Sequence, residues 1–237
     1  MKRTVLFGIN GNFGKYFASN ILADRDILGI DINCSYSLDE IASADTIIFC
    51  TPYRATKKIL SQIRNAVLPQ HTLIDICSVK SDLYDLAALP AQNIVSLHPL
   101  YSANSSPKIK HCVLCEIRGF LADNSFHKHF TFTRMTVDEH DKAMAVVQAA
   151  IHFQNYVTAH FLKRNSPRVK TQLGTILHTV LEKQLAQNPH MMAEIQTCNP
   201  HVRPAILNLK DSFDKMLDAV LAGDTQKVAQ TVKSIAS

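Results

Sequence analysis

Short apolar runs alternate with amphipathic stretches over the first 135 or so residues of the chain. The apolar runs have the length and composition of buried strands, and they cover residues 4–9, 27–31, 46–51, 72–77, 94–99, 111–117 and 131–136. Between the first five runs lie helix-like stretches, near residues 12–23, 37–43, 54–66 and 81–88. Continuous apolar strands that alternate with helices indicate a parallel sheet covered on both faces. Right-handed crossovers then predict a doubly wound, mostly parallel α/β domain over residues 1–136.

The pattern changes after residue 136. No strand-like run follows, and apolar residues such as Met144, Val147 and Ile151 recur at helical spacing. Two breaks, Asn165-Ser166-Pro167 and Asn199-Pro200, divide this part into four or five helices. We therefore expect an all-helical second domain over residues 137–237.

Composition and charge narrow the class of protein. Hydrophobic residues make up 46% of the 237 residues and charged residues 19%, so the chain can bury a sizeable core. No apolar run approaches the roughly 18 residues that span a bilayer, and the short run behind the basic start does not resemble a signal peptide. The net charge of +5 comes from scattered basic residues. We expect a cytoplasmic protein whose ligand is a small anion, with neither nucleic acid nor membrane as a partner.

Six cysteines are present, and four of them lie inside apolar strand-like runs. A buried free cysteine behaves as a small hydrophobic side chain, so we expect reduced thiols. Cys112 and Cys115 have the spacing of half a zinc site, but residues three apart on a strand point to opposite faces. We expect no metal site.

Glycines gather where the first strand meets the first helix. Gly8, Gly11 and Gly14 account for three of the seven glycines in the chain. At this junction glycines let the backbone approach a pyrophosphate, and the helix N-terminus offers free N–H groups. This is the position of a Rossmann-like dinucleotide fingerprint, although the spacing is GxxGxxG. The loop residues expected to bind the cofactor are Gly8, Asn10, Gly11, Asn12, Phe13 and Gly14.

Asp31 closes the second strand, about 20 residues beyond the glycines. A carboxylate there can accept hydrogen bonds from a ribose 2′-hydroxyl and repels a 2′-phosphate. The sequence therefore favours NAD over NADP. A turn or helix-capping aspartate is the alternative interpretation.

Further motifs fall at the carboxyl ends of predicted strands and on the first long helix. They read Thr51-Pro52, Ser78-Val79-Lys80, His98-Pro99-Leu100-Tyr101, Glu139-His140-Asp141 with Met144-Ala145, and Gln148-Ala149 with His152-Phe153. In this order they resemble the prephenate dehydrogenase family over nearly the whole chain. The resemblance implies an NAD-dependent oxidoreductase of tyrosine biosynthesis that decarboxylates prephenate oxidatively. It also implies a homodimer formed through the helical domain, and we expect a stand-alone enzyme without a chorismate mutase domain.

The resemblance assigns roles to individual residues. His98 is the expected proton acceptor, since histidine's ordinary pKa of about 6.5 suits a general base. Taken alone, a histidine that merely ends a strand is the simpler interpretation. Lys80 is expected to hold a substrate carboxylate or the cofactor ribose, with a solvated lysine as the alternative. His140, Met144, Gln148 and His152 follow one another four residues apart, which predicts one helical stripe. The catalytic residues expected are His98, Lys80 and His152, the further cofactor contacts are Thr51, Pro52 and Ser78, and the substrate contacts are Tyr101, His140 and Gln148.

The sequence departs from the family pattern at three positions. Cys50 stands where the family usually has a serine that bonds the catalytic histidine, and Ser102 stands where it tends to have glycine. No arginine occurs near Gly174-Thr175, where the family's substrate-binding arginine is expected; Arg203, Lys170 or Lys183 could substitute. Two alternatives therefore stay open. The same chemistry could act on arogenate or another cyclic hydroxy acid, or the protein could be a catalytically silent NAD-binding dimer.

Overall fold

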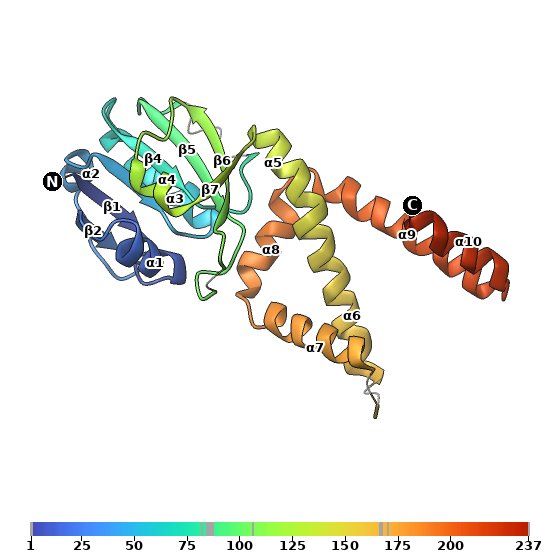
Figure 1. The fold of residues 1–237 in the computed structure, drawn as a ribbon. Helices are drawn as coiled ribbons and strands as arrows, with labels where there is room; N and C mark the ends of the chain where they lie inside the picture. The colour runs from blue at the N-terminus through green and yellow to red at the C-terminus, as the bar shows by residue number, and fades with distance from the viewer. Residues whose placement is uncertain are drawn as a thin grey trace. The chain divides into compact units, whose positions relative to one another are not determined.

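The structure is a computed structural model and describes residues 2–81, 83, 88–105, 107–165, 168–169 and 171–236. The chain forms two compact units (Figure 1). Unit 1 comprises Met1–Asp141 together with His190–Asn199, and unit 2 comprises Lys142–Pro189 and Pro200–Ser237. Unit 1 carries the sheet, and unit 2 is helical wherever it has regular structure. The first domain thus extends five residues beyond the predicted boundary at 136, and it gains one later helix.

Unit 1 contains a seven-stranded sheet in the order β2-β1-β3-β4-β5-β6-β7. The strands are β1 (Arg3–Phe7), β2 (Asp26–Ile30), β3 (Thr46–Phe49), β4 (Thr72–Asp75), β5 (Asn93–Pro99), β6 (His111–Arg118) and β7 (Thr131–Arg134). The first five strands are parallel, β6 is antiparallel to β5, and β7 is parallel to β6. The doubly wound, mostly parallel sheet is confirmed. Chain order reverses at β1 and β3, the kind of switch point where open α/β sheets bind ligands.

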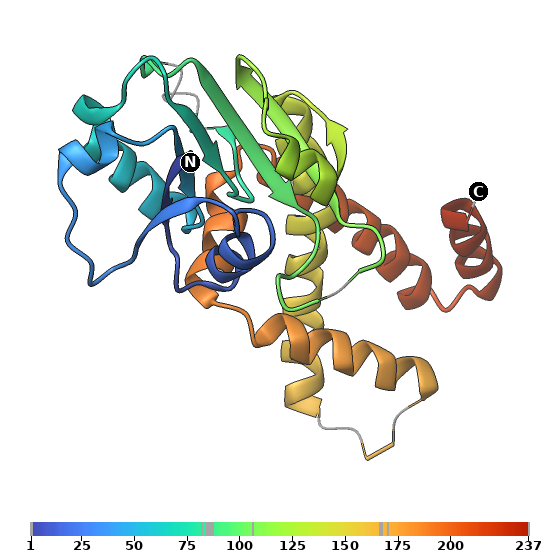
Figure 2. The same cartoon turned by 60° about the vertical axis from the view of Figure 1, so that its left-hand side comes forward.

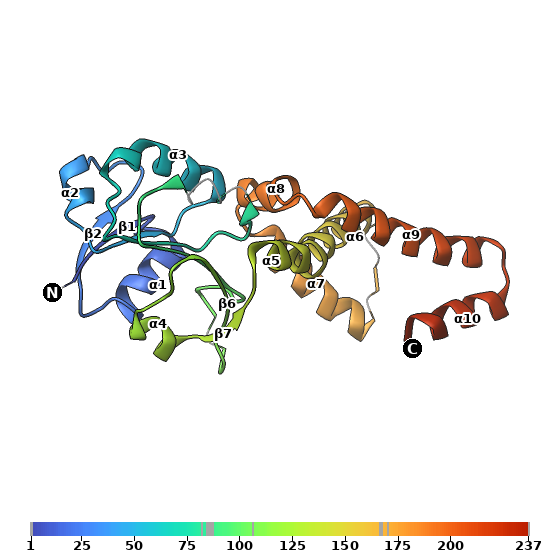
Figure 3. The same cartoon turned by 90° about the horizontal axis from the view of Figure 1, so that it is seen from above.

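Helices cover both faces of this sheet (Figure 3). On one face lie α1 (Asn12–Asn20) and α4 (Asn124–His129), and on the other lie α2 (Leu38–Ala42) and α3 (Tyr53–Ile63). Successive strand residues pack into hydrophobic cores on opposite faces of the sheet. Leu6 packs in the core on the side of α1, and Phe7 packs in the core on the side of α2 and α3. Because every strand in the middle of the sheet is buried on both sides, the sequence shows continuous apolar runs instead of alternation.

Two parts of unit 1 differ from the sequence-based expectation. The short helix α4, which Asp123 caps by accepting from the Ser125 backbone N–H, was not predicted. Helix α8 (Pro189–Cys198) contributes residues 190–198 to unit 1, although its sequence lies within the predicted helical domain. The helix predicted near 81–88 falls mostly on residues outside the described ranges.

Unit 2 is all-helical, as predicted. Its helices are the end of α5 (Val137–Met144), a π-helical segment (Ala145–Ala150), α6 (Ile151–Asn165), α7 (Gln172–Leu185), α9 (Val202–Leu221) and α10 (Thr225–Ala236). Figure 2 shows α7 lying beside α6, and α10 folding back beside α9. Within the described part of the chain, no helix combines the length and the apolar character needed to cross a membrane.

A π-helical segment interrupts the helix that carries the stripe predicted from the sequence. Its backbone bonds from residue i to i+5, so each turn takes up more residues than in an α-helix. The single stripe of His140, Met144, Gln148 and His152 stays a prediction. His140 belongs to unit 1, whereas Gln148 and His152 belong to unit 2.

Candidate active site

The glycine loop between β1 and α1 is tightly packed. Gly8 has φ +80°, and its backbone N–H donates to the Ile30 carbonyl at 2.8 Å. A Cβ on Gly8 would lie 2.4 Å from the Cys50 carbonyl oxygen, and one on Gly14 would lie 2.0 Å from the Gly8 carbonyl oxygen. The glycines therefore let the loop, the first helix and the end of β3 approach one another, as a dinucleotide loop requires.

The N-terminus of α1 has the donors and the field that a phosphate needs. Gly11 caps this helix, its first turn holds no acidic residue, and the first intrahelical bond runs from the Lys15 N–H to the Gly11 carbonyl. The backbone N–H groups of Asn12, Phe13 and Gly14 therefore precede the helical ladder and carry the positive end of its dipole. The loop fits an anionic pyrophosphate.

Asp31 lies just beyond β2, next to the glycine loop. Its carboxylate accepts from the backbone N–H of Asn10 at 2.8 Å and from that of Ile32 at 2.9 Å. These two bonds fix the orientation of the carboxylate and leave further lone pairs for hydroxyl donors. The geometry fits a ribose diol and opposes a phosphate at the same place.

His98 is the next-to-last residue of β5, the strand that ends in His98-Pro99. Tyr101 follows in the loop, and its ring lies 6.2 Å from that of Phe13 in the glycine loop. The His-Pro segment and the glycine loop are therefore neighbours at one edge of the sheet. Of the other predicted cofactor contacts, Thr51 and Pro52 join β3 to α3, and Ser78 follows β4.

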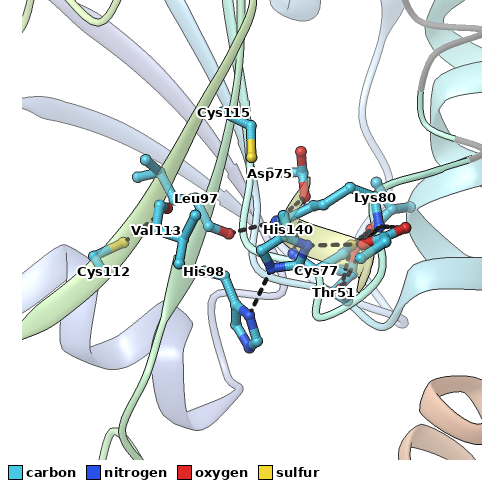
Figure 4. A network of polar contacts seen from close by, with 12 residues as sticks. Thr51, Asp75, Cys77, Lys80, Leu97, His98, Cys112, Val113, Cys115 and His140 are labelled. Carbon is cyan, nitrogen blue, oxygen red and sulfur yellow. Dashed lines mark hydrogen bonds and ion pairs between the residues drawn. The ribbon is translucent and has the colours of Figure 1, made fainter. Parts of the chain in front are cut away.

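A chain of hydrogen bonds leads away from His98 (Figure 4). His98 Nδ1 lies 2.9 Å from His140 Nε2, and His140 Nδ1 lies 2.8 Å from Asp141 Oδ1. The Asp141 carboxylate also accepts from the backbone N–H groups of Lys80 and Ser81 and from the Ser81 hydroxyl. His140 and Asp141 are fully buried, and His98 is 5% exposed. Both ring nitrogens of His140 are thus engaged within the protein.

Burial and charge set the protonation of this chain. Desolvation, followed by the nearby Lys80 ammonium and His140, holds the pKa of His98 well below its usual range. Desolvation also lowers the pKa of His140, against the opposing effect of its bond to Asp141. Burial resists ionisation of Asp141, but the donors on His140 and Ser81 outweigh it and lower the pKa of the carboxyl. Two neutral histidines beside a carboxylate are the result at neutral pH.

Lys80 is buried, in contrast to the solvated lysine considered from the sequence. Its Nζ lies 3.2 Å from Asp75 Oδ1 and donates to the Leu97 carbonyl at 2.6 Å (Figure 4). The Lys80 side chain is 0% exposed and that of Asp75 is 2% exposed. The ammonium therefore holds the ends of β4 and β5 together. Its role towards a substrate carboxylate or a ribose stays a prediction.

The remaining predicted residues belong to unit 2. Among the described residues, buried polar atoms without a hydrogen-bond partner include Gln148 Oε1, His152 Nδ1 and the Tyr156 hydroxyl. Burial of His152 lowers its pKa, which favours a neutral ring. Thr175, near the position expected for the arginine, bonds the Thr171 carbonyl from the first turn of α7. Arg203 and Lys183 are exposed, and Lys170 lies outside the described residues.

The cysteines are free thiols, as expected. Cys112 and Cys115 pack in different clusters on β6, so they do not share a site. The described residues contain no group of three or more side chains that could hold a metal ion. Burial raises the pKa of Cys50, so this residue is a neutral thiol and a weak hydrogen-bond donor.

Asp75, Ser81 and Asp141 are three residues of the site for which the sequence predicted no role. The importance of Asp75 could have been inferred, because it lies within an apolar strand-like run. A buried aspartate is almost always paired, so its position there predicts a partner. Asp141 directly follows His140 in a motif that was noted, but its contacts with residues 60 and 61 positions away are not visible in the sequence. These three side chains fix the positions of the residues that were predicted.

Comparison with known families matches both parts of the chain. Residues 18–111 match the nucleotide-binding domain of prephenate dehydrogenase, and residues 136–234 match its dimerization domain. Among curated proteins, a probable arogenate/prephenate dehydrogenase of Methanocaldococcus jannaschii is 20% identical over 84% of this chain and 52% of its own length. The T-protein of Haemophilus influenzae is 22% identical over 94% of this chain and 63% of its own length. The chain thus spans less than two thirds of these relatives.

Solved structures share the fold over the whole chain. The prephenate dehydrogenase of A. aeolicus, crystallised with hydroxyphenyl propionate and NAD+, has a TM-score of 0.77 at 17% identity, covering 100% of this chain and 96% of that one. Synechocystis arogenate dehydrogenase has a TM-score of 0.68 at 12% identity, covering 98% of this chain and 96% of that one.

Proposed function

Because the chain belongs to the prephenate dehydrogenase family, we propose that it is an NAD-dependent dehydrogenase that decarboxylates prephenate oxidatively. The observation that carries the proposal is His98, placed at the end of β5 with Nδ1 bonded to His140. This arrangement leaves Nε2 as the nitrogen that can accept a proton. A neutral imidazole with a lowered pKa is competent as a general base at neutral pH.

The cofactor, when bound, supplies the hydride acceptor. The glycine loop and the first N–H groups of α1 bind its pyrophosphate, and Asp31 binds the hydroxyls of its adenosine ribose. Thr51, Pro52 and Ser78 are proposed as further contacts. Two backbone hydrogen bonds hold the Asp31 carboxylate in place, so it cannot rotate away from a 2′-phosphate. The repulsion between the two negative charges favours NAD over NADP.

The reaction needs one proton acceptor from the protein. The ring carbon bearing the hydroxyl group loses its hydrogen as hydride, and His98 Nε2 takes the hydroxyl proton. The ring carboxylate then leaves as carbon dioxide, and its bonding electrons complete the aromatic ring, which turns the new carbonyl oxygen into a phenolate. His98 gives its proton back to that oxygen, so the product is a phenol and the base is neutral again. Catalysis of this kind by a positioned base contributes about 10²–10⁴-fold to the rate.

The substrate is proposed to be a small cyclic hydroxy acid. His152 and Gln148 support this, because His152 Nδ1 and Gln148 Oε1 are buried and lack a protein partner among the described residues. A ligand hydroxyl, amine or carboxyl group would satisfy such atoms. Prephenate is the first choice, and arogenate is the second because no arginine lies near Thr175. Consistent with the dimerization domain that matches residues 136–234, we propose a homodimer.

The test is a substrate panel assayed for NADH and NADPH formation. Prephenate and arogenate are supplied separately with each cofactor, and carbon dioxide release is measured in parallel. His98→Ala should lower turnover by about 10²–10⁴-fold while NAD still binds. His111→Ala, an exposed position on β6, is the matched control and should keep wild-type turnover. Unchanged turnover in His98→Ala would exclude His98 as the base.

A further inference from the structure

One feature of unit 1 is not explained by general base catalysis alone. The Nδ1 atom of His98 does not face solvent, because it lies 2.9 Å from His140 Nε2. His140 in turn meets Asp141 Oδ1 at 2.8 Å. His98, His140 and Asp141 thus form a line of hydrogen-bonded side chains. The aspartate end of this line is closed to solvent, since His140 and Asp141 are both 0% exposed.

The protons on this line follow from the carboxylate. Asp141 accepts from the backbone N–H groups of Lys80 and Ser81 and from the Ser81 hydroxyl, so its oxygens face donors only. An ionised carboxylate accepts and cannot donate. His140 therefore carries its hydrogen on Nδ1, and a neutral His140 has a bare Nε2. His98 must then donate from Nδ1 to that bare nitrogen.

We infer that Asp141 and His140 are positioning residues that lock His98 in its Nδ1–H tautomer, so that Nε2 is the bare nitrogen facing the substrate. The inference rests on the proposed function, because it assigns that nitrogen a proton to accept. The neighbours of His98 thereby decide which of its two nitrogens carries the hydrogen. A free imidazole could carry its hydrogen on either nitrogen.

The opposite arrangement would disable the base. If His140 carried hydrogens on both nitrogens, it would donate to His98 Nδ1, and the neutral His98 would hold its hydrogen on Nε2. Burial and the Lys80 ammonium both oppose a charged His140. Once His98 accepts the substrate proton, its new charge faces Asp141 through the His140 ring. The line therefore favours the ready base before the reaction and stabilises the imidazolium after it.

The aspartate end is anchored from several elements. Lys80 and Ser81 bond it from the segment that follows β4. Asn199, which directly follows α8, donates from Nδ2 to the Asp141 backbone carbonyl at 2.8 Å. Support of this kind keeps the residue that contacts the substrate within the narrow range of geometry that catalysis needs.

The direct test reads the tautomers by long-range ¹H–¹⁵N correlation of the histidine rings at neutral pH. In the wild-type protein, His98 and His140 should both be protonated at Nδ1. His71 is an internal reference of the opposite kind: its Nδ1 accepts from the Leu68 N–H at 3.1 Å, and its Nε2 lies 3.2 Å from the Ala42 carbonyl. It should read as Nε2–H in every variant. A wild-type His98 protonated at Nε2 would overturn the inference.

Variants then connect the tautomer to turnover. In Asp141→Asn the amide can donate to His140 Nδ1, which should move both hydrogens to Nε2 and lower kcat by about 10²–10⁴-fold, with the KM for NAD little changed. His140→Gln can still accept from His98 through its carbonyl and should lose less than about tenfold. His140→Leu cannot accept and should lose at least ten times more than His140→Gln. Equal losses in the Gln and Leu variants would contradict the inference.

These readouts separate two kinds of failure. If the wild-type protein converts no member of the substrate panel, the proposed function fails, and the nitrogen correlations alone decide the tautomer. If Asp141→Asn does not fold, the Gln and Leu variants at position 140 carry the comparison. A purely structural role for His140 would lower stability without moving the His98 hydrogen, and that outcome would also overturn the inference.

Discussion

Lys80 and Asp75 form a buried ion pair whose removal should be costly to the fold. The two side chains are 0% and 2% exposed, with Nζ and Oδ1 3.2 Å apart. Lys80→Met keeps most of the side-chain volume but removes the ammonium from the Asp75 carboxylate, which keeps the bond that its Oδ1 accepts from the Cys77 backbone N–H at 2.9 Å. It also removes the donor to the Leu97 carbonyl. Breaking a buried pair by removing one partner typically costs about 3–5 kcal/mol.

The measurement has to report on unit 1 rather than on the whole chain. Because the protein has two compact units, a single unfolding free energy is not well defined. The chain also contains no tryptophan to serve as an optical probe. Hydrogen exchange of the β4 and β5 amides, read as an opening free energy, gives the local stability. Lys80→Met should lower it by about 3–5 kcal/mol, whereas Lys58→Met on the exposed side of α3 should change it by less than about 0.5 kcal/mol.

A second substitution tells charge from packing. Asp75→Asn removes the uncompensated charge while keeping an oxygen for the Cys77 N–H. The double variant Asp75→Asn with Lys80→Met should therefore be more stable than Lys80→Met alone, by about 1–3 kcal/mol of coupling. A cost below about 1 kcal/mol for Lys80→Met, or no recovery in the double variant, would refute the reasoning.

Three further predictions follow from the site. The lowered pKa of His98 should keep the acid limb of kcat/KM well below pH 6.5, and a limb at or above 6.5 would count against a buried neutral base. Below about pH 6.5, His98 is protonated in the unfolded state but stays neutral in the folded state, so the stability of the fold should fall as the pH drops. This fall should be less steep in His98→Asn than in the wild type. Gly14→Ala, whose Cβ would lie 2.0 Å from the Gly8 carbonyl oxygen, should lower NAD affinity by at least tenfold in isothermal titration, whereas Gly11→Ala, at 3.2 Å, should cost less. Asp31→Asn should narrow the preference for NAD over NADP in steady-state kinetics, and an unchanged ratio would remove Asp31 from the ribose site.

The fold was predictable where its determinants are local. Runs such as residues 46–51 and 72–77 gave the parallel strands, because strands buried on both faces contain few polar residues. The glycine loop was also found, since its three glycines lie within seven residues. The antiparallel direction of β6 was not predicted, because direction depends on the loop that joins it to β5. Helix α8 gave no sequence signal that it belongs to unit 1.

The site was predictable only in part, for a related reason. His98 and His140 were both identified, but they are 42 residues apart, and no pattern in the chain shows that they share a hydrogen bond. Lys80 was expected to hold a substrate carboxylate or the cofactor ribose, with a solvated lysine as the alternative. Its burial depends on Asp75, five residues earlier, and on the Leu97 carbonyl of a neighbouring strand. Tertiary partners decide which polar groups remain available for a ligand.

Opposed charges around His98 set its strength as a base. The Lys80 ammonium resists a second positive charge at the ends of β4 and β5, and burial acts in the same direction. Asp141 acts in the opposite direction, but it reaches His98 only through His140. The result is a histidine that stays neutral in the resting protein and yet has a carboxylate aligned with the charge it acquires when it accepts a proton. Lys80 and Asp141 therefore act on opposite sides of the same equilibrium, which explains why both are buried next to a base.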